Sequence, residues 1–192
     1  MSDIVIAAYR RSPFTPAHKG ALAAVRPDDI AAGVVKSLVE SCEVDVESLE
    51  DLRLGCAFPE AEQGFNLARM VTFLAGLPQE VAGATTNRFC GSSMQTIHDA
   101  AGALALGSGV AYLCGGVESM SRVPMTGFNP LPHPGLVAER PEVLTSMGIT
   151  AENLAVRYGI DRRVQDEFAV ESHRKAAAAA EAGNFDAEIV EI

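Results

Sequence analysis

Short apolar runs alternate with segments of helical periodicity along residues 1–119. The apolar runs are typical of buried strands and lie at residues 4–9, 52–58, 80–87 and 110–114. Between them, apolar residues recur three or four positions apart, as on one face of a helix, at residues 27–39, 66–75 and 91–106. Because strands joined by helical crossovers lie parallel in one sheet, this alternation predicts a layered α/β domain with a mostly parallel sheet covered by helices.

The pattern changes at residue 120. Residues 120–141 contain five prolines and no periodicity of either kind, which predicts a long irregular excursion with a role in function or assembly. The remaining elements are predicted to be two helices and a short strand, at residues 150–158, 161–183 and 188–192. We therefore expect an α/β domain at residues 1–119 and a second region at residues 120–192.

Composition narrows the classes of function. Apolar residues make up 48% of the chain and charged residues 21%, as in ordinary globular proteins. The net charge of −10 argues against nucleic acid and anionic membranes as partners, because their phosphate groups would be repelled. No window contains the ~18 apolar residues that a membrane span requires, and the first residues lack the basic region of a signal peptide. We therefore expect a cytoplasmic protein with no membrane or nucleic-acid partner.

The cysteines and histidines do not form a metal-binding pattern. No two cysteines have the C-x-x-C spacing, and the histidines, at positions 18, 98, 133 and 173, do not complete a ligand set. We expect no metal site. Three cysteines lie in apolar periodic segments and are interpreted as core residues: Cys42, Cys56 and Cys114.

Cys90 stands apart, because it lies between a predicted strand and a predicted helix. At a helix N-terminus the unpaired backbone N–H groups and the positive end of the helix dipole favour an anion such as a thiolate. The position suits a nucleophile, and the alternative is a small buried apolar residue, as most free cysteines are. His98 lies ~12 Å further along the same helix and cannot act as its base, so we expect a partly buried helix residue. His133 or His173 would have to be brought to Cys90 by the fold.

Two glycine-containing segments do not resemble phosphate-binding loops. Gly107-Ser108-Gly109 follows a helix and precedes a strand, the reverse of the order that points a helix N-terminus at a phosphate, and is interpreted as a turn. Gly115-Gly116 follows a strand, where glycine allows the backbone to pass close to another element.

Several motifs occur in a family-like order. Residues 87–94 read N-R-F-C-G-S-S-M, residues 115–120 read G-G-V-E-S-M, and residues 147–153 read M-G-I-T-A-E-N. They resemble, respectively, the acyl-enzyme cysteine motif, the G-G-x-E-S-M segment and the M-G-x-T-A-E-N element of the thiolases, acyl-CoA acetyltransferases of the condensing-enzyme group. Weaker matches to the same family lie at residues 11–14, 158–160, 165–169 and 185–190. The chain thus resembles the N-terminal half of a thiolase over nearly its whole length.

The resemblance implies a thiolase-like fold with an inserted loop and helical region, and residues 120–192 would begin the loop domain. It implies that Cys90 attacks an acyl-CoA thioester and carries the acyl group, with its own backbone N–H helping to hold the oxyanion. Met147 would lie near the acyl pocket and bind substrate. Coenzyme A would be a substrate and no other cofactor is implied. The expected partners are further copies, as a dimer or tetramer, or a complementary C-terminal half.

Two departures from the family accompany these matches. Ser146 precedes the M-G-x-T-A-E element, where members that prefer short acyl chains often have histidine. The histidine of the family's G-H-P motif, its second cysteine, a later asparagine and the C-terminal domain lie beyond residue 192 in the family's order. We therefore expect acyl transfer, by thiolysis of 3-oxoacyl-CoA or condensation of acetyl-CoA, only with the second half present. The alternative is a non-catalytic thiolase-like subunit or interaction module.

Overall fold

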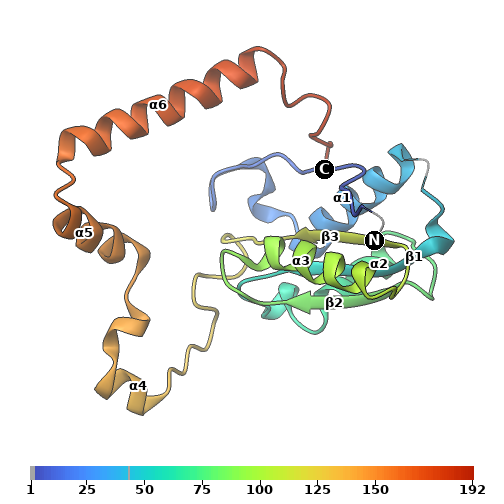
Figure 1. Cartoon of the computed structure of the whole chain (residues 1–192), viewed down its shortest axis with the longest axis horizontal. Coiled ribbons are helices and arrows are strands. Elements are labelled where there is room, and N and C mark those ends of the chain that lie inside the picture. Colours follow the sequence, from blue (N-terminus) through green and yellow to red (C-terminus); the bar gives the residue numbers. More distant parts are fainter. Residues whose placement is uncertain (1–2, 43) are drawn as a thin grey trace. The chain divides into compact units, whose positions relative to one another are not determined.

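The computed structural model describes residues 3–42 and 44–192, which form two compact units (Figure 1). The first unit comprises the chain up to Asn129 together with Glu188–Ile192, and the second comprises Pro130–Ala187. The first two residues, on which part of the localisation prediction rests, lie outside the described range. The assignment of residues 120–192 to a loop domain stays a prediction.

The first unit is built on a parallel sheet of three strands in the order β2-β1-β3. The strands are β1 (Leu49–Gly55), β2 (Ala82–Thr86) and β3 (Ala111–Gly116). In the central strand, Leu54 pairs with Thr85 on one side and with Gly115 on the other. The predicted parallel α/β sheet is confirmed, with three of the four predicted strands in it.

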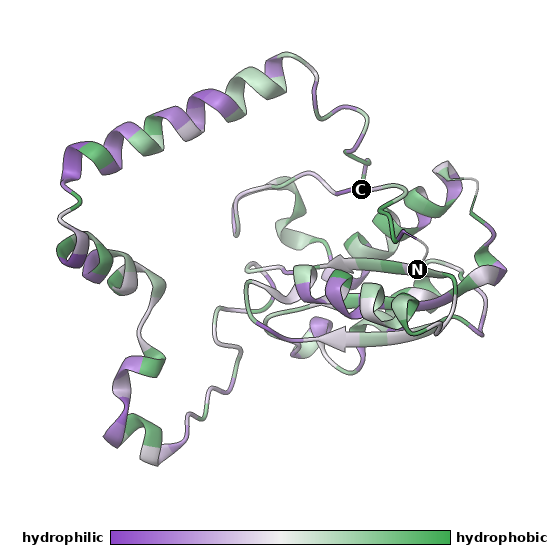
Figure 2. Ribbon diagram, in the orientation of Figure 1, coloured by the Kyte–Doolittle hydropathy of each residue, from purple (hydrophilic) through white to green (hydrophobic). Residues whose placement is uncertain are grey.

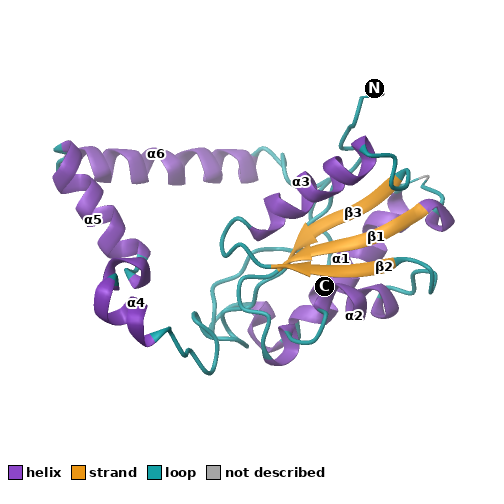
Figure 3. Cartoon of the chain, turned by 60° about the horizontal axis from the view of Figure 1, so that its bottom comes forward, coloured by secondary structure: helices purple, strands orange, loops and turns teal. Residues whose placement is uncertain are grey.

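Helices cover the two faces of this sheet (Figure 3). On one face lie α1 (Pro27–Ser41) and α2 (Leu67–Leu74), and on the other lies α3 (Ser92–Ala105). Proline at the first helical position and two aspartates in the first turn favour the start of α1. Short 3-10 helices precede or separate these elements at Ala21–Ala24, Val46–Ser48 and Ala61–Gln63.

The core lies between the sheet and the helices α1 and α2. Val35 of α1 and the apolar side of α2 pack onto β1, which contributes Leu52 and Leu54. On the opposite face, α3 buries Thr96 and Ala100. The most buried residues of the core between the sheet and the helices α1 and α2 are Leu52, Leu54, Cys56, Leu67, Ala68, Val71 and Val81.

The prediction of a strand at residues 4–9 is wrong. Val5 and Ile6 are 75% and 73% exposed, and the first backbone pairing in the described chain is an isolated parallel bridge between Arg11 and Ile189. A strand is held by its ladder, and residues 4–9 find no ladder partner among the described residues. The short strand predicted at residues 188–192 is also wrong, because within the described chain this segment forms only that bridge, in which the N–H of Val190 donates to the carbonyl of Arg11 at 2.9 Å. Val190 is buried there.

The second unit is helical. It contains α4 (Pro134–Glu139), a 3-10 helix (Pro141–Leu144), α5 (Met147–Tyr158) and α6 (Arg162–Glu181). Helix α4 lies in the stretch 120–141 that was predicted to be irregular, and the 3-10 helix begins at its last residue, so that prediction is wrong in part. Each of the two helices has a proline at its start, where the missing N–H is tolerated.

The two longer helices of this unit were predicted, and their ends follow local rules. Ser146 Oγ accepts the N–H of Ile149 at the start of α5, and α5 ends at Gly159, whose φ is 63°. Asp161 Oδ1 accepts the N–H of Val164 at 3.0 Å and begins α6. Hydrophilic and hydrophobic residues follow one another along the mostly exposed α6 (Figure 2). Within the described residues, no helix is both long enough and apolar enough to cross a membrane.

Candidate active site

Cys90 lies between β2 and α3, in the turn directly before the helix N-cap Gly91. This turn lies beyond the carboxyl end of the parallel strands, the edge at which open α/β sheets bind ligands. The side chain of Cys90 is exposed. The predicted strand-to-helix junction is confirmed, and the alternative of a buried apolar cysteine is wrong.

The backbone of this turn is held on both sides of Cys90. Phe89 has a φ of 47°, in the left-handed region that costs a non-glycine residue about 1–2 kcal/mol. Its N–H donates to Asn87 Oδ1 at 3.0 Å, on the strand side. On the helix side, Ser92 Oγ accepts the N–H of Arg88 at 2.8 Å and donates to the carbonyl of Phe89 at 2.6 Å. Surrounding hydrogen bonds therefore fix a backbone conformation that the sequence alone disfavours.

Two glycines allow the start of α3 to approach the sheet. A Cβ added to Gly55, at the end of β1, would lie 2.4 Å from the backbone nitrogen of Ser93 and the carbonyl carbon of Ser92. A Cβ on Gly116, at the end of β3, would lie 1.9 Å from Ser93 Oγ. The prediction that Gly115-Gly116 lets another element pass close is confirmed for Gly116. The distance between the start of α3 and the sheet, and with it the position of Cys90, therefore depends on two residues that have no side chain.

A polar cluster lies below the turn. Gln63 is completely buried, and its amide oxygen accepts the N–H of Ser119 at 2.7 Å. Its amide nitrogen donates to the carbonyl of Phe58 at 2.9 Å and to Glu118 Oε1 at 2.5 Å. Glu118 Oε2 accepts the N–H of Ala57 at 2.7 Å. These bonds join residues 57–63, which follow β1, to residues 118–119, which follow β3.

The other cysteines differ from Cys90 in exposure. Cys56 is buried, as predicted, whereas Cys42 and Cys114 are only half-buried, so their assignment to the core is wrong in degree. Burial raises the pKa of the Cys56 thiol to about 12, with the nearby Glu118 carboxylate as the next cause. Burial also raises the pKa of the Cys114 thiol. Both thiols therefore stay protonated around neutral pH.

We expect iodoacetamide to alkylate Cys90 in the folded chain at about pH 8 and to leave Cys56 and Cys114 unmodified, because the thiolate is the nucleophile. Peptide mass mapping would measure the extent of alkylation at each position. In denaturant Cys56 and Cys114 should react as well, since their pKa values return to the ordinary range. Alkylation of Cys56 as fast as Cys90 under native conditions would contradict the expectation.

Neither histidine of the first unit, His18 or His98, forms a hydrogen bond with the thiol of Cys90. Within the described residues no side chain forms a hydrogen bond with Cys90 Sγ, and no group of three or more potential ligands could hold a metal ion. His98 is on α3, as predicted, but it is exposed rather than partly buried. His133 caps α4, where its Nδ1 accepts the N–H of Gly135, and His173 lies on α6. Both belong to the second unit.

Met147, the predicted substrate-binding residue, is the first residue of α5 and is 71% exposed. It belongs to the second unit, whereas Cys90 belongs to the first. Its role stays a prediction.

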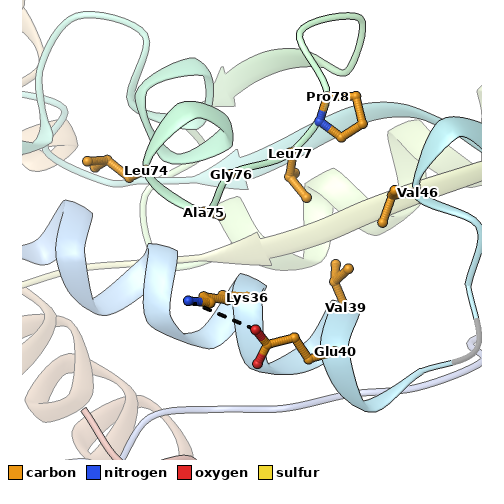
Figure 4. Close-up of a pocket in the computed structure, with 9 residues that line it drawn as sticks. All are labelled: Lys36, Val39, Glu40, Val46, Leu74, Ala75, Gly76, Leu77 and Pro78. Carbon is orange, nitrogen blue, oxygen red and sulfur yellow. Dashed lines mark ion pairs between the residues drawn. The ribbon is translucent and has the colours of Figure 1, made fainter.

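A surface hollow of about 400 Å³ lies elsewhere in the first unit (Figure 4). It is lined by the end of α1 and by residues 74–78, and Lys36 forms an ion pair with Glu40 at its wall. Its other walls precede β1 and β2, so it lies at the amino edge of the sheet, opposite to the edge that carries Cys90. No cysteine, serine, threonine or histidine lines this hollow, and its one amine, that of Lys36, is paired with Glu40. The candidate chemistry therefore stays with Cys90.

Asn87, Gln63 and Gly55 received no role from the sequence. Asn87 had a usable signal, because asparagine commonly accepts a backbone N–H two residues later and so forms a turn. Gln63 had none, since its partners Glu118 and Ser119 lie 55 and 56 residues away in the chain. Glycine in a strand indicates close backbone approach, but does not say to what.

Comparison with known proteins assigns the family. The chain matches the family model of the thiolase N-terminal domain over residues 4–192. It is 46% identical over 192 residues to the 3-ketoacyl-CoA thiolase of Bacillus subtilis (strain 168), covering 100% of this chain and 49% of that protein. It is also 46% identical over 190 residues to the 3-ketoacyl-CoA thiolase of Idiomarina loihiensis, covering 98% of this chain and 49% of that protein. The chain thus spans about half the length of these relatives. It belongs to the thiolase family and carries that family's N-terminal domain.

Proposed function

We propose that this chain supplies the nucleophile of an acyl-CoA acyltransferase of the thiolase type. The observation that carries the proposal is the exposed Cys90 in the turn before α3, at the carboxyl edge of the sheet. The names of the relatives, 3-ketoacyl-CoA thiolases, supply the class of substrate. Acyl-CoA and free CoA are therefore the proposed partners, and CoA acts as a substrate rather than as a resident cofactor.

In the proposed reaction, Cys90 Sγ attacks the thioester carbonyl of an acyl-CoA. The tetrahedral intermediate collapses with release of the CoA thiolate and leaves the acyl group on Cys90. No group in the described part of the chain accepts a hydrogen bond from the backbone N–H of Cys90, which leaves this donor free for the oxyanion. In condensation, the acyl group then passes to the α-carbon of a second acetyl-CoA, which has lost a proton, and a new carbon–carbon bond forms. Thiolysis is the reverse: Cys90 Sγ attacks the 3-oxo carbonyl of a 3-oxoacyl-CoA, and the bond between C2 and C3 breaks. Acetyl-CoA leaves after its α-carbon takes up a proton, and the acyl group on Cys90 then passes to the thiol of free CoA.

The proton of the Cys90 thiol needs an acceptor. The described residues place no base within hydrogen-bonding distance of Sγ. The relatives are about twice as long as this chain. We therefore propose that the base and the acid for the leaving groups come from a second half or a partner chain. A homo-oligomer, a cytoplasmic location and a contribution of Met147 to the acyl pocket belong to the same proposal.

The test compares residues 1–192 alone with the complete enzyme, which here means this chain together with the second half or partner chain proposed above. The complete enzyme is mixed with acetyl-CoA and quenched in acid, and we expect one acetyl group on the peptide that contains Cys90. Residues 1–192 alone are expected to give no measurable thiolysis of acetoacetyl-CoA. Turnover by the complete enzyme without acylation of Cys90 would contradict the mechanism, and the absence of any turnover would favour a non-catalytic subunit.

A further inference from the structure

Asn87 connects the turn that carries Cys90 to the neighbouring strand end. Its Oδ1 accepts the N–H of Phe89 at 3.0 Å, and its Nδ2 donates to the carbonyl of Ala57 at 3.0 Å. One exposed side chain thus holds the backbone just before the nucleophile and the backbone that follows β1, 30 residues earlier. The two bonds use the acceptor and a donor of the same amide, which fixes its orientation.

Ala57, to which Asn87 donates, is itself held in place by hydrogen bonds. Ala57 donates its N–H to Glu118, and Glu118 accepts the side-chain amide of Gln63. Because Gln63 is completely buried, this end of the chain of hydrogen bonds is rigid. The rings of Phe58 and Phe89 add a contact between the same two segments, with centroids 6.1 Å apart. Asn87 therefore joins the turn to a fixed point.

The conformation of Phe89 decides where the next peptide points. Its φ and ψ angles orient the peptide bond to Cys90, whose N–H is the donor available for an oxyanion. The left-handed φ of 47° at Phe89 is disfavoured by about 1–2 kcal/mol, so it persists only while its surroundings impose it. The bond from the N–H of Phe89 to Asn87 is the one that acts on this residue from the strand side.

We propose that Asn87 is a positioning residue for acyl transfer, which holds the backbone N–H of Cys90 in the direction that stabilises the oxyanion. The inference rests on the proposed function of Cys90. Asn87 touches neither the substrate nor Sγ and acts through Phe89. Its loss lowers the rate of the chemical step and leaves substrate affinity and the intrinsic reactivity of the thiol nearly unchanged.

The test uses the complete enzyme with Asn87→Ala and Asn87→Asp, and Asn184→Ala as a matched control. Asn184 is exposed in the second unit and, among the described residues, its side chain makes no hydrogen bond. For Asn87→Ala we expect kcat to fall ~100-fold with KM within ~2-fold, because a misdirected oxyanion donor costs on that order. Asn87→Asp keeps the acceptor for Phe89 and loses the donor to Ala57, so its expected loss is ~10-fold. Asn184→Ala should match the wild type.

Two further readouts separate positioning from stability and from the proposed function. Alkylation of Cys90 by iodoacetamide needs no oxyanion donor, and its rate should stay within ~3-fold in both Asn87 variants. A kcat unchanged in Asn87→Ala, or an alkylation rate that falls as much as kcat, would overturn the inference. If Asn87→Ala does not fold, Asn87→Asp takes its place: a fall in kcat with a nearly unchanged alkylation rate supports the inference, and an equal fall in both overturns it. A wild-type enzyme that never acylates Cys90 would instead refute the proposed function.

Discussion

Replacing Cys90 by serine in the complete enzyme is expected to lower the rate of thiolysis by about 10⁴-fold or more. The serine hydroxyl has nearly the same size as the thiol but ionises far less readily, and the thiolate is the better nucleophile. The side chain is exposed, so the free energy of unfolding should change by less than about 0.5 kcal/mol. Steady-state rates with acetoacetyl-CoA and a urea unfolding curve would measure the two quantities.

The matched control is Cys42→Ser. Cys42 is a half-buried cysteine at the C-cap of α1, outside the turn and the polar cluster described above. Its replacement should leave kcat within ~2-fold, because it contacts no part of the candidate site. A Cys90→Ser enzyme that keeps a tenth or more of the wild-type rate would show that another group carries the acyl chain.

Replacing Gly55 by alanine is expected to destabilise the first unit by about 2–3 kcal/mol, the cost of forcing a methyl group into packed backbone. The new Cβ would lie 2.4 Å from the backbone of Ser92 and Ser93, and a helix backbone cannot move aside as a flexible side chain can. The start of α3 must therefore lift away from the sheet, which also displaces Cys90. Urea unfolding would measure the loss of stability, and acylation of Cys90 should slow in the folded fraction.

Gly102→Ala provides the opposite case within the same helix. Gly102 lies inside α3, and a Cβ there would meet no atom within 4 Å. Alanine in an exposed helix interior is favoured over glycine, so this variant should be more stable by about 0.5–1 kcal/mol. Equal effects of the two substitutions would show that the close approach at Gly55 does not hold α3 in place.

The elements that local rules encode were predicted well. The starts of α1 at Pro27 and of α6 after Asp161, and the end of α5 at Gly159, each depend on a residue within one helical turn. The strand at residues 4–9 failed for the opposite reason: an apolar run becomes a strand only if another strand offers it a ladder. Residues 188–192 likewise acquire their single bridge from Arg11, 178 positions away from Ile189.

The position of Cys90 follows from sequence, because the change from strand to helical periodicity falls at residue 90 and a helix N-terminus favours an anion wherever it forms. What surrounds Cys90 does not follow from it. Asn87 meets Ala57, Gln63 meets Glu118 and Gly55 meets Ser93 only after three parallel strands bring their carboxyl ends together. Local propensities act over a few residues and so place Cys90 at the start of a helix. Contacts between distant strand ends, which only tertiary packing creates, decide how the turn that carries Cys90 is held.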